Sequence, residues 1–438
     1  MKADRAARVL VLGGYGLVGL PIVRRLIDAG ADVVGLGRDP EFGRAREPRC
    51  AWIGADISSM TSPGQWASCL SGIDVVVNVS GALQTGLRDN LHAVQEKAVV
   101  ALIEACETAD VTRFVQISAP GASASAETEF LRTKGVADAR LRSSSIGWVI
   151  LKPGLVVSSD AYGGTALLRM LASFPIVLPV VHADACVATV DATEVAEAVA
   201  LAVSGGIPAG SDIEVAEQHP GTLRDVVMAF RSWLGLSRPV AIIDLPPVIG
   251  HAAGKVADVA GWLGWRSPLR STALKVIAGG VGADSGEYSR ITGREPTGLA
   301  ETLTRYPSTV QERWFALLYL AMPAAVLTLS LFWIVSGLVG LVRLEESAAH
   351  MAAAGIGSAE AKAVVVAGSV IDLAVGAGAL VRKMARPACL AMVAVTAAYL
   401  LGGTFVKPEL WMDPLGPYVK TVPAAMLAMM TAVLVRTR

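Results

Sequence analysis

One uncharged hydrophobic run limits what this chain can fold into more than any other feature of its sequence. Residues Phe315 to Val342 are 28 consecutive positions without Asp, Glu, Lys or Arg. A helix of about 20 apolar residues is long enough to cross the hydrocarbon core of a bilayer. The run therefore predicts a transmembrane helix, and part of the protein has to lie in a membrane.

Three further apolar segments follow this run, so we expect an all-α domain of about four transmembrane helices. The last is the weakest, because Lys420 and Pro423 lie near its start. The expected spans are residues 315–342, 363–381, 388–406 and 417–435.

Charge near the expected spans predicts how the domain is oriented. Basic residues gather between the second and third spans at Arg382, Lys383 and Arg386, and again in the tail. Such residues favour the cytoplasmic side. The N-terminus has no long apolar run typical of a signal peptide. We therefore expect a multi-pass protein of a bacterial-type inner or cell membrane, with the N-terminal domain and the C-terminus in the cytoplasm.

The sequence before Trp314 has the mixed composition of a soluble α/β protein, and almost all the apolar excess follows it. The 438 residues are enough for two or three domains. Thirty-eight basic and 38 acidic residues cancel, which argues against a nucleic-acid partner. The five cysteines are scattered without metal-ligand spacing, so we expect no metal site.

A glycine-rich turn near the N-terminus predicts a nucleotide site. The apolar run Val9 to Leu12 has the character of a strand, GGYGLVG follows at Gly13 to Gly19, and a helical pattern continues to Gly30. In such a unit Gly13 permits a sharp turn, Gly16 lets a diphosphate approach the backbone, and Gly19 lets the helix pack closely on the strand. Strand, turn and helix in this order indicate a Rossmann fold, a doubly wound parallel sheet.

Later strand ends supply the rest of the expected cofactor site. Arg38 follows the second strand and favours NADP over NAD, because an arginine can pair with a 2′-phosphate, although the adjacent Asp39 weakens this argument and NAD stays possible. Asp56 could accept a hydrogen bond from adenine or simply cap a turn. The expected cofactor-binding residues are Gly13, Tyr15, Gly16, Leu17, Val18, Gly19, Arg38, Asp56, Ile57, Val79, Ser80, Gly81, Lys134 and Pro153.

The first two thirds of the chain resemble the extended and atypical short-chain dehydrogenase/reductase families, most closely the branch that includes the nucleotide-binding accessory subunit of respiratory complex I. The resemblance rests on the GxxGxxG spacing and on five segments, namely residues 54–57 (GADI), 78–81 (NVSG), 114–118 (FVQIS), 151–154 (LKPG) and 190–196 (VDATEVA). It implies a Rossmann domain with a small substrate lobe over residues 1–280. The segment 281–312 is rich in Gly, Pro, Thr and charged residues, which predicts a connector.

The same resemblance implies a catalytic serine, tyrosine and lysine, but the chain departs from that pattern. Ser118 and Lys134 match, whereas Phe130 occupies the place of the tyrosine, four residues before the lysine. A phenyl ring cannot transfer a proton. Either Lys134 serves only to hold the ribose, or another acid acts, with the candidates Tyr162, Asp160, His182 and Asp184.

The last third, residues 313–438, resembles the DoxX-like membrane family through residues 333–338 (WIVSGL), 371–376 (IDLAVG) and the loop that contains Trp411. Asp372 lies within the second expected span. A carboxylate there is costly, so it is either a functional group or a neutral partner in a hydrogen bond between helices, for example with Tyr399 or Trp333.

These features together predict a membrane-anchored NAD(P)-binding oxidoreductase that acts near a lipid-soluble or quinone-type partner. The alternative is a non-catalytic nucleotide-sensing or assembly protein, which Phe130 favours. A transporter gated by nucleotide would depend on Asp372 alone.

Overall fold

The computed structural model describes residues 6–81, 90–265, 267, 269–352 and 355–437. These residues form two compact units, and the main chain passes from the first to the second between Arg313 and Trp314. The short segment that begins at Ala260 also belongs to the second unit.

A seven-stranded parallel sheet forms the centre of the first unit, with the strand order β11-β6-β5-β4-β1-β2-β3. This confirms the expected doubly wound Rossmann fold. The chain order of the strands reverses beside β1, which lies between β2 and β4. The strands are β1 (Arg8–Leu12), β2 (Asp32–Gly37), β3 (Ala51–Gly54), β4 (Val75–Asn78), β5 (Arg113–Ile117), β6 (Gly147–Pro153) and β11 (Ser211–Val215).

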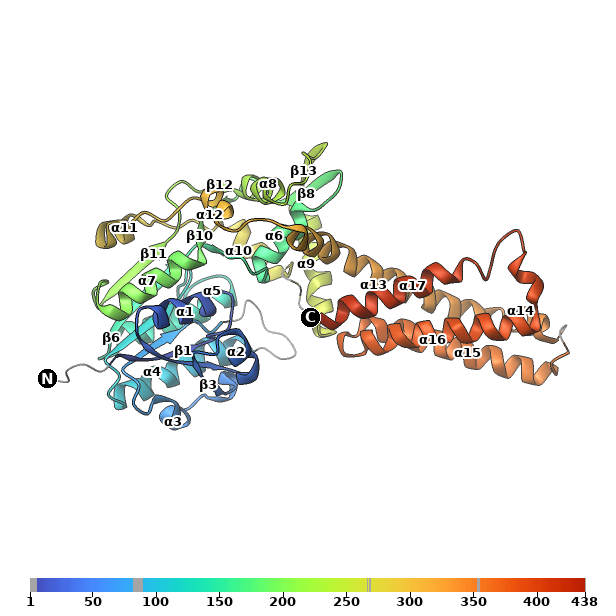
Figure 1. The fold of residues 1–438 in the computed structure, drawn as a ribbon, viewed down its shortest axis with the longest axis horizontal. Coiled ribbons are helices and arrows are strands. Elements are labelled where there is room, and N and C mark those ends of the chain that lie inside the picture. Colours follow the sequence, from blue (N-terminus) through green and yellow to red (C-terminus); the bar gives the residue numbers. More distant parts are fainter. Residues whose placement is uncertain (1–5, 82–89, 266, 268, 353–354, 438) are drawn as a thin grey trace. The chain divides into compact units, whose positions relative to one another are not determined.

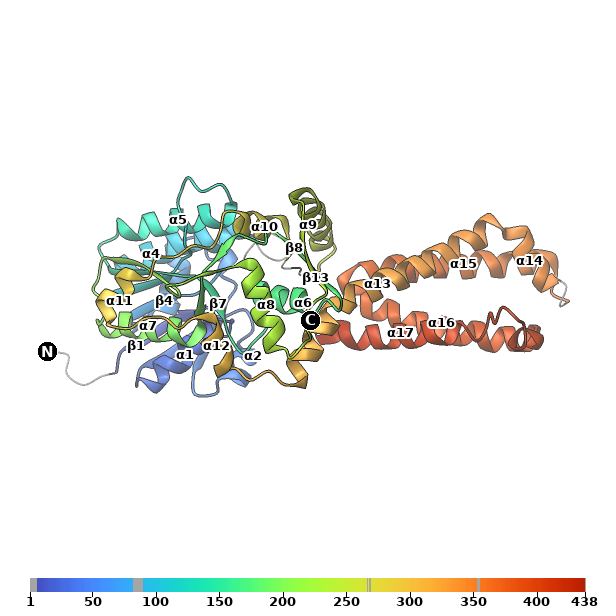
Figure 2. The ribbon, with the colours of Figure 1, turned by 90° about the horizontal axis from the view of Figure 1, so that it is seen from above.

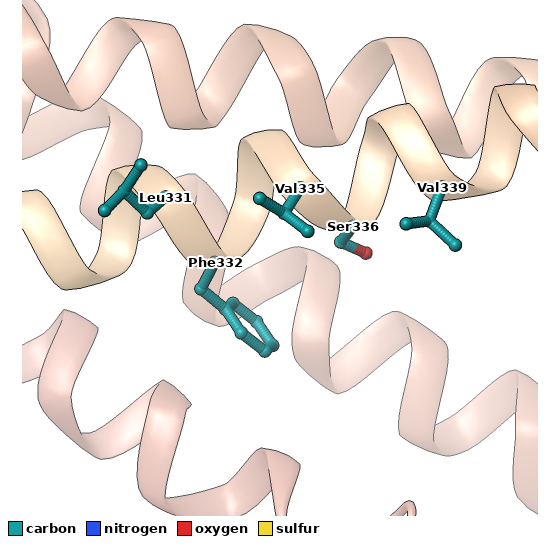
Figure 3. A pocket seen from close by; sticks show the side chains of 5 residues that line it. All are labelled: Leu331, Phe332, Val335, Ser336 and Val339. Carbon is teal, nitrogen blue, oxygen red and sulfur yellow. The ribbon is translucent and has the colours of Figure 1, made fainter.

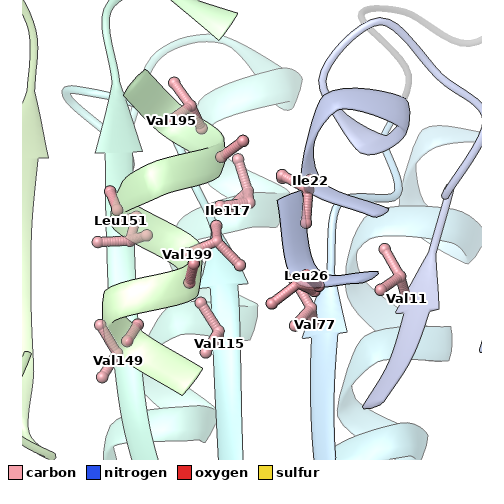
Figure 4. Close-up of a cluster of buried hydrophobic side chains, with 14 of the residues drawn as sticks. Val11, Ile22, Leu26, Val77, Val115, Ile117, Val149, Leu151, Val195 and Val199 are labelled. Atoms are coloured by element: carbon pink, nitrogen blue, oxygen red, sulfur yellow. The ribbon is translucent and has the colours of Figure 1, made fainter. Parts of the chain in front are cut away.

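Helices cover both faces of this sheet because the apolar side chains of each strand alternate between the faces. In β1, Val9 and Val11 join one buried cluster, while Leu10 and Leu12 join the other. The first cluster packs under α1 (Gly19–Asp28) and α7 (Ala192–Ser204), as Figure 4 shows. The second includes side chains of α4 (Ala98–Thr108) and α5 (Glu129–Arg142).

Smaller elements follow the sheet at the position expected for a substrate lobe. Three two-stranded sheets pair β7 with β10, β8 with β13, and β9 with β12. Two amphipathic helices, α6 (Gly163–Ala172) and α8 (Leu223–Trp233), pack against each other. The strands are β7 (Leu155–Val157), β8 (Val177–Val181), β9 (Cys186–Val187), β10 (Thr189–Asp191), β12 (Gly221–Thr222) and β13 (Ala241–Leu245).

The segment 281–312, which we expected to be a connector, contains the helices α11 (Gly286–Thr292) and α12 (Leu299–Arg305) and lies in the first unit. Tyr288 and Leu303 are buried there. The backbone N–H of Leu299 donates to Glu217, which is itself buried. The segment is therefore folded against the Rossmann unit, and the domain limits stay predictions of the sequence.

The second unit is a bundle of long helices (Figure 2). Within the residues that the structure describes, three helices are long and apolar enough to cross a membrane, namely α13 (Val310–Val342), α15 (Ser358–Leu380) and α16 (Arg382–Val406). The fourth expected span is the 14-residue α17 (Thr421–Leu434), which at 1.5 Å per residue rises only about 21 Å. It is shorter than a full span, because the residues before Thr421 do not continue the helix. A short helix, α14 (Leu344–Ala352), follows α13.

Candidate functional site

The glycine turn after β1 forms a backbone cradle at the start of α1. Gly13 has a φ of +71°, and a Cβ there would lie 3.2 Å from the carbonyl oxygen of Val79. A Cβ on Gly19 would overlap the carbonyl oxygen of Gly13. Larger residues therefore do not fit at either position. The N-terminus of a helix attracts anions through its free N–H groups and its dipole, so the cradle fits a dinucleotide diphosphate.

An aromatic cluster fixes the backbone at the end of β2. The hydroxyl of Tyr15 accepts a hydrogen bond of 3.2 Å from the N–H of Asp39. The Tyr15 ring packs against Phe42 and Trp52, with centroid distances of 5.5 and 5.8 Å. The carboxylate of Asp39 accepts from the N–H of Phe42 at 2.9 Å and so caps α2 (Pro40–Arg46). Asp39 is thus engaged in capping, while Arg38 beside it is exposed.

Asp56 follows β3 and caps a single turn of 3-10 helix, Ile57–Ser59. Its Oδ1 accepts hydrogen bonds from the N–H and the hydroxyl of Ser58, at 3.0 and 2.8 Å. Capping, the simpler of the two roles considered from the sequence, is therefore the one that the structure displays. Recognition of adenine by Asp56 and Ile57 stays a prediction.

A buried hydrogen-bond network holds the ends of β4 and β5 together. The amide of Asn78 donates to Gln116 at 2.9 Å, and its Oδ1 accepts from the hydroxyl of Ser80 at 2.5 Å. All three side chains are buried. The network fixes Val79 and Ser80 beside the cradle, so the sheet end is rigid where the sequence predicts ribose contacts.

Lys134 contacts the same edge of the sheet at the end of β5. Its Nζ donates a hydrogen bond of 2.9 Å to the carbonyl oxygen of Ile117, and burial lowers the pKa of the ammonium. A Cβ on Gly81 would lie 3.8 Å from this Nζ. The Phe130 ring is centred 5.8 Å from the same atom, so the phenyl group adjoins the lysine as the sequence spacing predicts.

Ser118, directly after β5, interacts with a residue that the sequence analysis missed. Its hydroxyl donates to Oδ2 of Asp138, whose side chain is fully buried. Burial raises the pKa of this carboxyl. Asp138 comes four residues after Lys134 on α5 and therefore shares its helix face. That spacing was the available signal, but the contact with Ser118 depends on the fold.

The structure places the four other candidate proton donors in different surroundings. Asp160 forms an ion pair of 2.5 Å with Arg46, and Asp184 forms one of 3.1 Å with Arg224. The side chain of Tyr162 is 62% exposed. His182 lies in a turn at a φ of 57°. None of these observations favours one of the four as the missing proton donor.

The expected residues follow the strands in a regular way. Gly13, Arg38, Asp56, Ser80 and Ser118 come at or just after the carboxyl ends of β1 to β5, and Pro153 ends β6. Because the strands are parallel, these positions share one edge of the sheet. Ligands of open α/β sheets bind at this edge, next to the point where strand order reverses.

Asp372 forms a polar cluster with two other helices of the second unit. Its oxygens accept hydrogen bonds of 2.8 Å from Ser336 and 2.9 Å from Tyr399. The three residues come from α15, α13 and α16, and Asp372 is 4% exposed. Tyr399 is thus one of the two partners that the sequence suggested.

An open groove of about 490 Å³ runs along α13 beside this cluster. Figure 3 shows the five residues that line it, and Ser336 is the only polar one; they are Leu331, Phe332, Val335, Ser336 and Val339. The serine therefore connects an apolar groove to the buried carboxyl group.

Two family models match separate parts of the chain. Residues 13–173 match the NAD(P)H-binding family, and residues 330–429 match the DoxX-like family. The first match covers the cradle and the Ser118–Lys134 region, and the second covers the Asp372 cluster.

Two curated relatives each match about a third of the chain. An NAD(P)H azoreductase of Xenophilus azovorans is 28% identical over 151 residues, which are 34% of this chain and 49% of the relative. A 2-alkyl-3-oxoalkanoate reductase of Shewanella oneidensis is 29% identical over 128 residues, which are 29% of this chain and 32% of the relative. The chain thus spans half or less of the length of these two proteins.

Solved structures share the fold. The Bordetella bronchiseptica enzyme WbmH, in complex with NAD+, has a TM-score of 0.54 and 15% identity, and the match covers 71% of this chain and all of WbmH. WbmG of the same organism, in complex with NAD, has a TM-score of 0.52 and 16% identity, with 69% and 93% covered. The chain therefore combines a Rossmann domain that is similar to the NAD(P)H-binding family with a helical domain that is similar to the DoxX-like family and has, among the described residues, three long apolar helices.

Proposed function

We propose that the protein is a membrane-bound, NAD(P)H-dependent reductase of a lipid-soluble acceptor with a carbonyl or quinone group. The observation that carries this proposal is the hydrogen bond from Lys134 to the carbonyl oxygen of Ile117, the residue directly before Ser118 at the carboxyl end of β5, on a sheet whose glycine cradle fits a dinucleotide. The two curated relatives are reductases by name. The DoxX-like domain supports a membrane location and hence an apolar acceptor.

The positions of the residues in the fold support the following proposed roles. The backbone from Gly13 to Gly19, which includes Tyr15, Leu17 and Val18, holds the diphosphate. Lys134 holds the nicotinamide ribose. Asp56 and Ile57 border adenine, Val79 to Gly81 border the ribose, and Pro153 borders the nicotinamide. Ser118 orients the acceptor carbonyl through its hydroxyl. When bound, reduced nicotinamide supplies a hydride.

NADP is the preferred cofactor in this proposal. Arg38 is exposed at the end of β2, where an arginine can pair with a 2′-phosphate. Asp39, the nearby acid that would favour an unphosphorylated ribose, is hydrogen-bonded to the first turn of α2. The exposed position of Arg38 at the end of β2 supports this preference.

For the membrane domain we propose a bacterial-type inner membrane, with the Rossmann domain and the C-terminus on the cytoplasmic side. Arg382 and Lys383 at the start of α16 and Arg436 after α17 support this orientation. The groove beside Ser336 is apolar, as a site for a quinone-type partner would be. Labelling of single cysteines placed at residue 383 and residue 409 tests the orientation, because only the first should be protected in intact cells.

The purified full-length protein in lipid nanodiscs tests the reductase activity. NADPH and NADH oxidation is followed with short-chain quinones and with carbonyl acceptors. Lys134→Met should weaken NADPH binding at least about tenfold, since it removes the group assigned to the ribose. Lys97→Met, at an exposed position, is the matched control and should bind NADPH like the wild type.

The absence of a tyrosine at Phe130 favours a second candidate, a nucleotide-sensing or assembly protein without turnover. The two candidates differ in one measurement. Tight NADPH binding with no oxidation across the whole panel of acceptors would establish the sensing role and overturn the reductase.

A further inference from the structure

A carbonyl reduction needs a proton for the developing alkoxide, and Phe130 supplies none. We propose that Asp138 provides this proton through the hydroxyl of Ser118. The inference rests on the proposed reductase activity and names the acid that the activity requires.

Asp138 is in contact with the edge of the sheet at which the cofactor site is proposed. Ser118 is the first residue after β5, and its hydroxyl is in hydrogen-bond contact with Oδ2 of Asp138. Lys134, one helical turn before Asp138, is bonded to the carbonyl oxygen of Ile117 on the same strand end. Serine hydroxyls both donate and accept, so Ser118 can pass a proton from one side to the other.

The surroundings of Asp138 favour the neutral acid that such a relay needs. Its side chain is fully buried, and within the described part of the chain its Oδ1 has no hydrogen-bond partner. A buried carboxylate with an unpaired oxygen is costly, whereas the protonated group is much less so. Desolvation accordingly raises the pKa of Asp138.

Nearby cations lower the pKa of Asp138, but two of them are also paired with another carboxylate. Lys134 and Arg142 face Asp138 from α5, and Lys152 faces it from β6. Asp212, on the adjacent strand β11, forms an ion pair of 2.7 Å with Lys152 and accepts a hydrogen bond of 3.2 Å from Arg142. Lys134 is buried, which itself disfavours its charged form.

The proposed step balances in atoms and electrons. When bound, the reduced nucleotide would supply the hydride for the carbonyl carbon, and the π electron pair of the C=O bond would move to the oxygen. For this transfer the Ser118 hydroxyl turns its proton toward the substrate oxygen and accepts a hydrogen bond from the protonated Oδ2 of Asp138. The substrate oxygen then takes the hydroxyl proton of Ser118, and Ser118 takes the carboxyl proton of Asp138. Asp138 is left as a carboxylate and regains its proton from water at the Ser118 end after the product leaves.

Infrared spectroscopy tests the protonation state without any turnover or cofactor. At neutral pH the wild-type protein should show a carboxylic acid C=O band that Asp138→Asn lacks and Ser118→Ala shifts. Absence of a band that depends on Asp138 would mean that the group is ionised, which overturns the inference even if the protein is an active reductase.

Kinetics test the relay itself. Asp138→Asn keeps the size of the side chain and its ability to accept from Ser118, so a purely structural role should survive it. We expect kcat to fall about 100-fold or more, with KM and NADPH affinity changed less than about twofold. In the wild type, kcat should fall as alkaline pH removes the proton from Asp138. The pH at which kcat falls should be different in Asp138→Glu.

A second variant tests whether another acid can replace Asp138 in protein that still binds NADPH. Phe130→Tyr restores a phenol near Lys134, so the double variant Phe130→Tyr/Asp138→Asn should recover at least about tenfold of the lost kcat. Activity retained in Asp138→Asn, or no rescue by the tyrosine in protein that still binds NADPH, overturns the inference alone. No turnover in the wild type overturns the proposed function and the relay with it.

Discussion

The hydroxyl of Tyr306 donates a hydrogen bond of 2.6 Å to Oδ1 of Asp191, a residue 115 positions earlier in the chain. Asp191 is fully buried. Its carboxylate also accepts a hydrogen bond from the N–H of Thr193, and Asp191 thereby caps α7. Arg305 adds an ion pair of 3.4 Å to the other oxygen of the same carboxylate. The end of the first unit is therefore held to the helix that covers one face of the sheet.

Tyr306→Phe should destabilise the first unit, because it removes a donor from a buried carboxylate. We expect a loss of about 1.5–3 kcal/mol, the range for hydrogen bonds to charged groups. Thermal unfolding of the full-length protein measures the effect. Tyr162→Phe is the matched control: its side chain is 62% exposed, and the melting temperature should not change. Equal melting temperatures for the two variants would contradict the assigned role of the Tyr306–Asp191 bond.

Gly19→Ala should abolish NADPH binding, because the added Cβ overlaps the carbonyl oxygen of Gly13 and displaces the cradle from the helix N-terminus. NADPH fluorescence in a titration measures the affinity, and we expect a loss of at least about 100-fold. Gly64→Ala provides the comparison, since a Cβ there meets no atom within 4 Å. Binding that survives in Gly19→Ala would show that the nucleotide does not use this cradle.

Arg38→Asp should weaken NADPH binding more than NADH binding, because the substitution replaces the proposed partner of the 2′-phosphate with a repelling charge. We expect the ratio of the two dissociation constants to change at least about tenfold. Arg44→Asp removes a cation that is paired with Glu41 on the surface of α2, and it should leave the ratio unchanged. Equal effects of Arg38→Asp on both nucleotides would remove the reason for preferring NADP.

The Rossmann fold could be predicted from the sequence because its signals are local. Val9 to Leu12 followed by GGYGLVG specifies a strand, a turn and a helix within about 20 residues, and the structure has β1 and α1 there. The ends of successive strands share an edge by topology, so positions such as Arg38 and Ser118 could be placed near one another before their side-chain contacts were known.

Contacts between distant residues could not be predicted in the same way. Asp138 is 20 residues from Ser118, and their hydrogen bond depends on how α5 packs against the end of β5. Residues 281–312 are rich in turn-forming residues, yet buried side chains such as Tyr288 fold them onto the first unit. Similarly, hydropathy indicated an apolar segment before Val435 but not where its helix starts, at Thr421.

Glu47 should make the stability of the first unit depend on pH under acidic conditions. Hydrogen bonds from Arg49, with a further ion pair to Arg24, lower its pKa from 4.5 to about 2. A lowered folded-state pKa contributes stability that is complete above about pH 4.5 and disappears as the pH falls to about 2. Glu47→Gln should therefore cost about 1–3 kcal/mol at neutral pH and progressively less across that window.

Melting temperatures of Glu47→Gln and wild type between neutral pH and about pH 2 measure this dependence. Glu41→Gln is the control, because Glu41 is exposed and pairs only at the surface with Arg44, a contact worth little. A difference between Glu47→Gln and the wild type that stays constant down to acidic pH would show that the carboxylate charge is not its source.

Asp372 and Tyr399 should be energetically coupled across α15 and α16. Asp372 accepts from both Ser336 and Tyr399, whereas an asparagine can accept through only one of its two terminal atoms. Asp372→Asn and Tyr399→Phe should each destabilise the bundle, and the double variant should cost less than the sum by about 0.6 kcal/mol, the mean for hydrogen bonds between membrane helices.

Unfolding of the full-length protein in mild detergent measures the four corners of this cycle. Thr404→Val with Trp411→Phe provides a parallel cycle, because the indole of Trp411 donates at 2.9 Å to Thr404 in a more exposed part of the same unit, and its coupling should be smaller. Additive effects of Asp372→Asn and Tyr399→Phe would show that the Asp372–Tyr399 bond contributes nothing to the bundle. The carboxyl group would then have to be explained by what it binds at the groove beside Ser336.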